Sequence, residues 1–311
     1  MQVNGRGSLG CFLVLLLGSL ARSAAPNEPM LIFDLAPKHE AQPYHFRSSQ
    51  DDFQIEQDPP PSRTNLDRLN ASGSAQFSAE SLPEILKKIP TDKVTVVDLR
   101  RESHGFVNGR PVSWWVDQNA GNTGKSLEEI EQEEKSKLDA LAQAGAATIN
   151  EVVKDDVQKT IQNATPTTVQ VESAAVEADV CQALQVEHFR SSVADDHRPD
   201  DAEVDRFVEF VTNLPLDRWL HFHCENGHGR TTTFLVLYDM LRNAKEVGLE
   251  DIVRRQWCLG GVDVLDVPSE DSWKYEFSVE RAAFVKKFYD YCQADTQDFQ
   301  MKWSTWVQGN P

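Results

Sequence analysis

The sequence has few cysteines for its 311 residues and lacks the close cysteine spacings that hold metals. Five cysteines are present, and the four beyond residue 25 stand far apart, at Cys181, Cys224, Cys258 and Cys292. Because no CxxC pair or similar cluster occurs, the spacing gives no zinc pattern. If Cys224 has to stay reduced, at most one internal disulfide can form among the other three.

Basic residues are scarce as well. Lys and Arg together number 31 against 49 Asp and Glu, which gives a formal net charge of −18. General nucleic-acid binding requires a basic face, so this composition argues against a nucleic-acid partner. A site that binds an anion must concentrate its cations locally, because the net field of the protein repels anions.

Long hydrophobic runs are missing. The main apolar run, residues 11–17, is well short of the ~20 apolar residues that a membrane-spanning helix needs. It follows Arg6 and precedes the small residues 23–25, which is the layout of a secretory signal. We expect a signal peptide over 1–25, cleaved near 23–25, and a secreted or periplasmic protein without membrane insertion. Removal of Arg6 and Arg22 would move the charge from −18 to −20.

What is present is ordinary for a globular chain: 40% hydrophobic and 26% charged residues. Residues 26–63 are rich in Pro and acids and predict an extended N-terminal arm. The apolar, β-branched run 94–99 predicts a buried strand within a segment 64–115. A change of composition marks a small inserted subdomain over 116–184, and the main domain continues over 185–311.

The inserted segment predicts one helix followed by strands. Ser126 and Glu129 form a capping box, and Gly145 can end the helix. The β-prone stretches 147–149 and 168–171 follow. The subdomain is therefore expected to be partly β, with the charged side of its helix exposed to solvent.

The last part of the chain alternates strands and helices. Val204, Phe207, Val208 and Val211 have helical spacing, and 219–223 reads as a buried strand. The chain closes with a helix over about 278–292, whose inward face is expected to hold Val279, Phe284, Val285 and Phe288. This alternation predicts an α/β fold with helices flanking a central sheet.

One loop between a strand and a helix contains a C-x5-R spacing, from Cys224 to Arg230. The backbone N–H groups between these residues can converge on one phosphate, and two glycines allow backbone angles that other residues resist. The start of the following helix adds donors and a positive dipole end. The loop residues expected to bind phosphate are Glu225, Asn226, Gly227, His228 and Gly229.

The same field stabilises the thiolate of Cys224, which can attack phosphorus and form a phosphocysteine. Arg230 can hold two phosphate oxygens through its planar fork, and Thr231 or Thr232 can donate to the thiolate as it is released. His223, directly before the nucleophile, is a further catalytic candidate. The alternative is a buried structural cysteine beside a helix-start arginine, which the strand, glycines and helix around it disfavour.

The segment HCENGHGRTT resembles the signature loop of the protein tyrosine phosphatase superfamily. It is most similar to HCxAGxGRTT of the protein-tyrosine-phosphatase-like phytases, with Asn226 in place of the usual alanine. The segment 98–109, DLRRESHGFVNG, resembles their DLRxESHGFxNG. The resemblance implies a phosphatase-like α/β domain with a small, partly β subdomain, no metal or other cofactor, and stepwise removal of phosphates from an inositol polyphosphate such as phytate.

A departing alkoxide needs a proton, so an acid is expected on a loop over the site. The stretch 193–199, VADDHRP, resembles the general-acid loop of this family, TDHxRP. Alignment from Pro199 makes Asp195 the acid, whereas alignment on the Asp-His pair makes it Asp196, and we favour Asp195. His197 is a candidate for substrate binding, while Asp200 fits the cap of the next helix better.

Several cations are candidates for substrate phosphates. Arg100, Arg101 and His104 follow the strand 94–99, and Glu102 is expected to orient an arginine rather than to touch substrate. By resemblance, the segments HFR and WKY supply Arg47 and Lys274 for distal phosphates. The alternative for all of them is a set of charged residues at the surface.

Three functions remain open from the sequence. The leading one is an inositol polyphosphate phosphatase acting on a small-molecule substrate. A secreted phosphotyrosine or phosphoinositide phosphatase would use the same loop. An inactive phosphate-binding module is disfavoured, because the nucleophile, the arginine and an aspartate are all present. The oligomeric state is not indicated.

Overall fold

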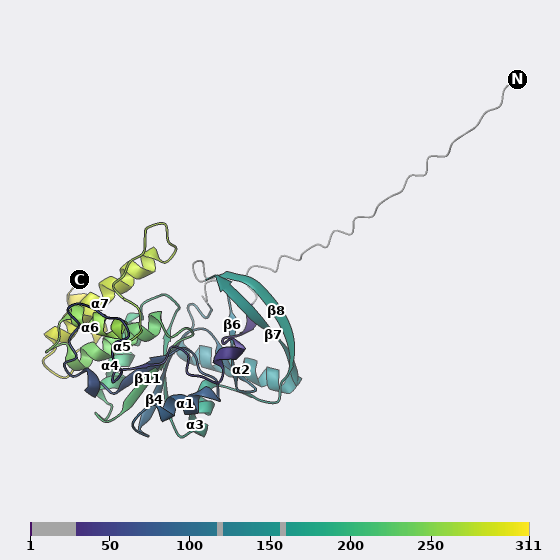
Figure 1. The fold of residues 1–311 in the computed structure, drawn as a ribbon, viewed down its shortest axis with the longest axis horizontal. Helices are drawn as coiled ribbons and strands as arrows, with labels where there is room; N and C mark the ends of the chain where they lie inside the picture. Colours follow the sequence, from purple (N-terminus) through teal and green to yellow (C-terminus); the bar gives the residue numbers. More distant parts are fainter. Residues whose placement is uncertain (2–28, 117–120, 156–159, 311) are drawn as a thin grey trace.

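The computed structural model describes Met1 and residues 29–116, 121–155 and 160–310 (Figure 1). The expected signal peptide therefore lies outside the described residues, apart from Met1. Two sheets with helices around them make up the described chain. Within the described residues, no helix combines the length and apolar character needed to cross a bilayer.

The larger part of the molecule is built on a five-stranded sheet with the order β10-β4-β11-β3-β2. Four strands run parallel to their neighbours, and the edge strand β2 is antiparallel to β3. All residues of β4 and β11 are buried, as expected for strands with helices on both faces. The bounds are β2 Arg47–Ser48, β3 Ala71–Ser74, β4 Val94–Arg100, β10 Glu187–Val193 and β11 Trp219–His223.

Alternation along β4 divides its side chains between two hydrophobic cores. Val97 and Leu99 join the core beneath α4, α5, α6 and α7, whereas Val94 and Val96 join the core beneath α1 and α3. The two groups of helices lie on opposite faces of the sheet (Figure 1). Their bounds are α1 Ser81–Lys87, α3 Glu177–Ala183, α4 Asp201–Thr212, α5 Gly229–Asn243, α6 Leu249–Cys258 and α7 Tyr275–Ala294.

The second sheet has six strands in the order β8-β7-β1-β6-β5-β9. The subdomain was expected to be formed by residues 116–184 alone. Its sheet also contains β1, from the expected N-terminal arm, and β5 and β6, from the segment 64–115. Pairing between distant segments recruits these strands, and local sequence carries no signal for it. The bounds are β1 Met30–Phe33, β5 His104–Val107, β6 Arg110–Trp115, β7 Ala146–Asp155, β8 Thr160–Gln170 and β9 Ala174–Ala175.

The helix α2, Leu127–Ala144, packs against the second sheet and begins and ends as predicted. Ser126 and Glu129 form the capping box, and Gly145 closes the helix with a φ of 68°. Ile130 and Leu138 are buried beneath it. Local capping signals therefore placed both ends of this helix.

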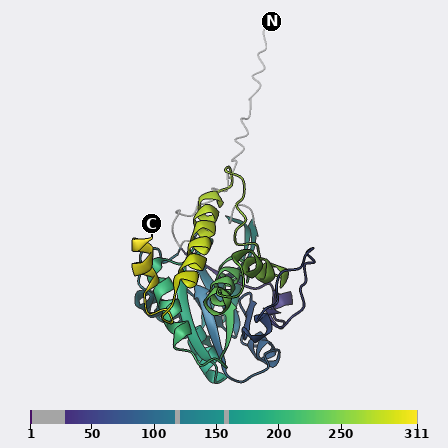
Figure 2. The same ribbon diagram turned by 90° about the vertical axis from the view of Figure 1, so that its left-hand side faces the viewer.

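The chain ends with two helices outside the sheet, the long α7 and the short α8, Trp303–Gly309 (Figure 2). Phe284, Val285 and Phe288 face the core as expected, but Val279 is 41% exposed. Short 3-10 helices occur at η1, Pro37–His39, and η2, Leu66–Arg68. The four cysteines beyond residue 25 are buried and free.

Candidate active site

The site lies where parallel strands of the five-stranded sheet end together. β11 leads into Cys224, β4 leads toward Glu102, and β10 leads into Asp195. Because the carboxyl ends of parallel strands share one edge of a sheet, the loops after them converge there. Residues from three distant parts of the sequence therefore meet at one place.

The loop after β11 is held from outside through its carbonyl groups. The Glu225 carbonyl accepts from the Gln76 backbone N–H at 3.0 Å. The Asn226 carbonyl accepts from His45 Nδ1 at 2.8 Å, and the Gly227 carbonyl accepts from Arg47 Nη1 at 2.8 Å. The C=O and N–H of a trans peptide point in opposite directions. The N–H groups of the following residues therefore face the concave side of the loop, where a phosphate would bind.

Gly227 is required by this geometry. Its φ is +74°, and a Cβ built on it would stand 2.5 Å from the Ala75 backbone nitrogen and 2.6 Å from the Ser74 carbonyl carbon. Gly229, in contrast, has open space around an added Cβ. Of the two predicted loop glycines, only Gly227 has both the left-handed φ and the close backbone approach.

Cys224 is 3% exposed at the start of the loop. The Thr231 hydroxyl donates to its Sγ at 3.2 Å. Of the two threonines proposed for this contact, Thr231 makes it, whereas the Thr232 hydroxyl accepts from Arg47 Nη2 at 3.0 Å. A donor fixed on Sγ stabilises a thiolate there.

Arg230 is buried and held by Glu102. Its Nη1 and Nη2 donate to the two carboxylate oxygens at 2.7 and 3.0 Å, and Nη1 also donates to the Val193 carbonyl. Burial opposes the charge of Arg230, yet Glu102 and Asp195 hold its pKa above the ordinary range. Arg230 Nε has no hydrogen-bond partner among the described residues.

The two adjacent aspartates separate in space. Asp195 Oδ1 lies 3.2 Å from Arg230 Nη2, and Asp196 Oδ1 lies 3.3 Å from Lys274 Nζ. Asp196 has a φ of +62°, and this left-handed turn directs the neighbouring side chains differently. Asp195 therefore faces the arginine of the loop, and Asp196 faces the start of α7.

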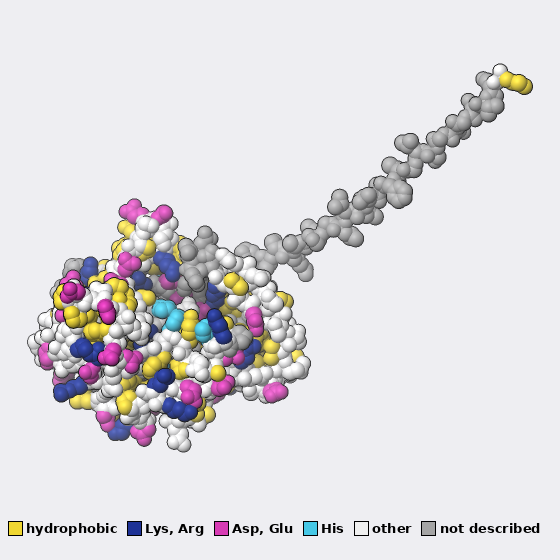
Figure 3. All heavy atoms as spheres, in the orientation of Figure 1, with side chains coloured by type: hydrophobic (Ala, Val, Ile, Leu, Met, Phe, Trp, Pro, Cys, Tyr) yellow, Lys and Arg dark blue, Asp and Glu magenta, His cyan; other side chains and the backbone are white. Residues whose placement is uncertain are grey.

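A cleft of about 510 Å³ opens over these groups. In the space-filling view of Figure 3, histidine side chains lie close together near the middle of the face toward the viewer. Basic and acidic side chains surround them. Seven of the predicted residues line the cleft: Cys224, Asp195, Asp196, Asn226, His228, Gly229 and Lys274. Its lining also includes Tyr44, His45 and Arg281.

Arg47 and His228 support the loop at its rim. Arg47 is 2% exposed, and burial lowers its pKa to about 10 against the opposing charge of Cys224. Its contacts place it beneath the loop rather than in the open cleft. The ring of His228 lies 4.2 Å from that of His45. Burial first, and then the charges of His45 and Arg47, lower the pKa of His228 to about 4.

Three predicted residues lie in a buried charge network behind the loop. Arg100 is fully buried and donates to Glu102, Asp34 and Gln76. His104 Nδ1 donates to the Glu102 carbonyl at 2.8 Å. The ring Nε2 of His223 contacts Glu177 at 2.6 Å. These side chains are inside the protein and brace Glu102 and the loop, so the structure does not bring them into the cleft.

Two further predicted residues, Arg101 and His197, line a neighbouring cavity of about 440 Å³ that shares Asp195 with the cleft. Arg101 donates to the backbone carbonyls of Asn122 and Lys125. His197 donates through Nδ1 to the Asp195 carbonyl at 2.7 Å and packs against Phe277. His197 thus fixes the backbone at the candidate acid.

Several residues of the cleft were not predicted from the sequence. His45 and Tyr44 stand at its rim with stacked rings 3.7 Å apart. Arg281 enters from α7, where burial lowers its pKa against the charges of Asp196 and Asp266. Outside the cleft, Lys154 of β7 pairs with the Glu225 side chain beside a second cavity. Arg281 lies seven residues after Lys274, two helical turns on, and this spacing could have indicated it.

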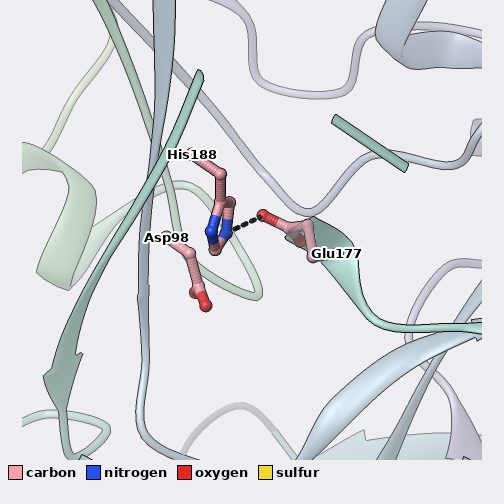
Figure 4. Close-up of side chains that lie close together, drawn as sticks. All are labelled: Asp98, Glu177 and His188. Atoms are coloured by element: carbon pink, nitrogen blue, oxygen red, sulfur yellow. Dashed lines mark ion pairs between the residues drawn. The ribbon is translucent and has the colours of Figure 1, made fainter. Parts of the chain in front are cut away.

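Asp98, Glu177 and His188 form a group whose ligand atoms lie within 4.8 Å of one another (Figure 4). Their charges are already matched by other groups. Asp98 Oδ2 lies 3.0 Å from Arg190 Nε and 3.3 Å from His104 Nε2. A metal ion there would lie beside a guanidinium, so the group fits the buried charge network better than a metal site.

Comparison with known proteins gives a family match that includes the loop and both candidate acids. The sequence model of the PTPlike_phytase family, described as inositol hexakisphosphate, matches residues 97–242. The solved structure of a PTP-like phytase from Bdellovibrio bacteriovorus is 35% identical. The match covers 91% of this chain and 97% of that chain, with a TM-score of 0.67.

Two longer proteins also match. The PTP-like myo-inositol phosphatase from Mitsuokella multacida, solved in complex with myo-inositol-(1,3,4,5)-tetrakisphosphate, is 35% identical with a TM-score of 0.85, covering 92% of this chain and 48% of that chain. Effector protein hopD2 of Pseudomonas syringae pv. tomato is 27% identical over 244 residues, which are 78% of this chain and 52% of hopD2. This chain spans about half the length of these two proteins.

Proposed function

Because this chain belongs to the family of protein-tyrosine-phosphatase-like phytases, we propose that it hydrolyses phosphate monoesters of myo-inositol polyphosphates through a phosphocysteine. The observation that carries the proposal is the arrangement at the loop. Cys224 accepts from Thr231 at 3.2 Å, and Arg230 is fixed on Glu102 in the same buried pocket. A nucleophile, a donor to it and a phosphate clamp therefore share one anion-binding loop.

In the first step, the Cys224 thiolate attacks phosphorus, and the bond from phosphorus to the leaving oxygen breaks. The backbone N–H groups of the loop and Arg230 hold the equatorial oxygens as their charge builds. A protonated aspartic acid gives its proton to the departing alkoxide. In the second step, water attacks the phosphocysteine and gives a proton to the same carboxylate, while the thiolate leaves toward the Thr231 hydroxyl.

We propose Asp195 as that acid. Its carboxylate is 3.2 Å from Arg230 and lines the cleft with Cys224. Asp196 instead pairs with Lys274. When a phosphate takes the place of the Asp195 carboxylate on Arg230, the negative charge of the phosphate favours the protonated form of Asp195. Substrate binding thus prepares the acid for transfer.

An inositol polyphosphate is supported by the family description and by the inositol tetrakisphosphate bound to the Mitsuokella protein. The chain offers Lys274 and Arg281 in the cleft for outer phosphate groups. A phosphotyrosine substrate would use the same loop but would leave these cations without a partner phosphate. The inositol substrate therefore uses more of the cleft.

Asp195→Asn and Asp196→Asn, each assayed on phytate and on para-nitrophenyl phosphate, test the proposal. Loss of the acid should lower turnover of phytate about 10²-fold or more and turnover of the aryl phosphate far less, because nitrophenolate leaves without a proton. We expect this pattern for Asp195→Asn. Its appearance in Asp196→Asn alone would reassign the acid.

Cys224→Ser serves as the inactive control in the same assays. Negligible phytate hydrolysis by the unmodified protein, with rapid hydrolysis of a phosphotyrosine peptide, would overturn the inositol phosphate substrate. Phosphate binding without any turnover would identify a binding module instead.

Export by the N-terminal signal is a second proposal and rests on the order of Arg6, the apolar run 11–17 and the small residues 23–25. Expression of the full chain and N-terminal sequencing of the released protein test it. A new N-terminus near residue 26 supports the proposal, and an intact Met1 on a retained protein contradicts it.

A further inference from the structure

A buried acidic residue directly follows the nucleophile in the loop. Glu225 follows Cys224, is 6% exposed, and its backbone carbonyl is fixed by Gln76. A carboxylate at this position acts against the thiolate and against a bound phosphate, because all three are anions in a poorly solvated site. The loop therefore needs a cation that offsets Glu225.

Lys154 supplies such a cation from the other sheet, in addition to Arg100, whose buried charge also interacts with Glu225. Its Nζ makes an ion pair with Glu225 Oε1, and the lysine side chain is 21% exposed. The two residues are 71 positions apart in sequence. The contact links the β7–β8 hairpin to the loop of the five-stranded sheet.

The backbone of the hairpin is adapted at this point. The register between β7 and β8 shifts between Val153 and Lys154, so that Val153 pairs with Asn163 and Lys154 with Ile161. The extra residue of this β-bulge is Gln162 on β8, opposite Lys154. A bulge bends and twists a strand pair locally and is common beside active sites. Val153 is 56% exposed, whereas Lys154 turns to the loop.

A cavity of about 240 Å³ lies beside the ion pair. Lys154 and Glu225 form part of its wall, together with Asp34 and Asn226. Asp34 is tied to Arg100 and Ser113. The pair thus stands at the junction of β1, β7 and the loop.

We infer that Lys154 is a positioning residue for the proposed reaction: it neutralises Glu225 and thereby keeps the field at Cys224 favourable for the thiolate and for phosphate. The inference rests on the phosphatase activity proposed above, although its effect on the thiolate is measurable without turnover. It also assigns the hairpin a role in setting the reactivity of a loop on the other sheet.

The test is the pH profile of Cys224 alkylation by iodoacetate, followed by mass spectrometry of the peptide. Lys154→Met should move the midpoint of the profile up by about one pH unit. Glu225→Gln should move it down, because the positive charge of Lys154 then remains. The midpoint of the double variant should lie within a few tenths of a pH unit of the midpoint of the unmodified protein. The profile of Lys154→Arg should match the profile of the unmodified protein at every pH.

Steady-state kinetics provide the second readout. Lys154→Met should lower kcat/KM for phytate about tenfold, while Lys93→Met, which removes a surface pair with Asp217, should leave it unchanged. A purely structural lysine would not give shifts of opposite sign in the two single variants. Coincident profiles for Lys154→Met and the unmodified protein, or a double variant that behaves like Lys154→Met, would overturn the inference.

The two proposals fail in different ways. Shifts of the alkylation midpoint in a protein without phosphatase activity would support the role of Lys154 and reject the proposed function. Full phosphatase activity with an unshifted midpoint would do the reverse. Should Lys154→Met fail to fold, Glu225→Gln and Lys154→Arg still decide the matter, since a midpoint unchanged in Glu225→Gln contradicts the inference.

Discussion

Glu102 places its two carboxylate oxygens on the two terminal nitrogens of Arg230, at 2.7 and 3.0 Å. Both side chains are buried, and the residues are 128 positions apart in the sequence. Burial disfavours the carboxylate, yet Arg230 and Arg100 hold the pKa of Glu102 well below its usual range. The guanidinium is therefore fixed in one orientation before any phosphate arrives, which reduces the cost of binding.

Replacement of Glu102 tests whether phosphate binding depends on this fixed orientation of Arg230. Glu102→Gln removes the negative charge that Arg100 and Arg230 share and leaves them only Asp34 and Asp195 as acidic partners. We therefore expect kcat/KM for phytate to fall about 10²-fold and the free energy of unfolding to fall by about 3 kcal/mol. Steady-state kinetics and urea unfolding measure the two effects. Glu84→Gln, in an exposed pair with Lys87, is the matched control. A folded Glu102→Gln protein with unchanged kcat/KM would contradict the proposed role.

Thr231 should matter most for the second chemical step. Its hydroxyl donates to Cys224 Sγ and can stabilise the thiolate as it leaves the phosphocysteine. Thr231→Val keeps the branched shape in this fully buried position but removes the donor. We expect kcat to fall about tenfold, with a burst of nitrophenolate before the steady state. Thr231→Ser should retain kcat, and absence of a burst in Thr231→Val would argue against this role.

Local signals in the sequence were sufficient to predict the loop and the two elements that flank it. The C-x5-R spacing, the preceding strand and the following helix all appear where they were predicted, because each depends on neighbouring residues. Glu102 was also expected to orient an arginine, and it does. The second arginine that it holds, Arg230, could not be identified without the arrangement of the sheet.

Contacts between residues far apart in the sequence could not be predicted from local sequence patterns. Nothing near Met30 indicates that β1 joins β6 and β7, since strand pairing at that distance depends on tertiary packing. Arg47 was expected at a distal phosphate but lies beneath the loop, where its two terminal nitrogens bind Gly227 and Thr232. A basic residue in the sequence does not reveal whether its charge faces solvent or supports a backbone.

The buried histidine of the charge network should make stability depend on pH. Burial lowers the pKa of His104, but Asp98 and Glu134 outweigh this effect and the opposing charges of Arg100 and Arg190, so its pKa is raised above 6.5. Its contribution to stability is therefore fully present below pH ~6.5 and is lost as the pH rises through the higher folded value.

His104→Gln tests this dependence. We expect the variant to be about 3 kcal/mol less stable than the unmodified protein at pH 5.5, because it leaves Asp98 without one of its cations. The difference should shrink as the pH rises above 6.5. Urea unfolding at intervals from pH 5 to 9 measures it. Comparison at each pH removes the contributions of other histidines, such as His188, and a constant difference would show that His104 does not titrate.

The two glycines of the loop provide a test of its backbone. At Gly227, an added Cβ would meet the backbone of Ser74 and Ala75 at 2.5–2.7 Å, in a residue with φ of +74°. Gly227→Ala should therefore lower the free energy of unfolding by about 2 kcal/mol or more and abolish the binding of inorganic phosphate. At Gly229 an added Cβ meets nothing within 4 Å, so Gly229→Ala should change stability by less than about 0.5 kcal/mol. Thermal unfolding and phosphate titration of both variants distinguish them. Equal stability of the two variants would mean that the loop relaxes around position 227 and is not held by its contact with β3.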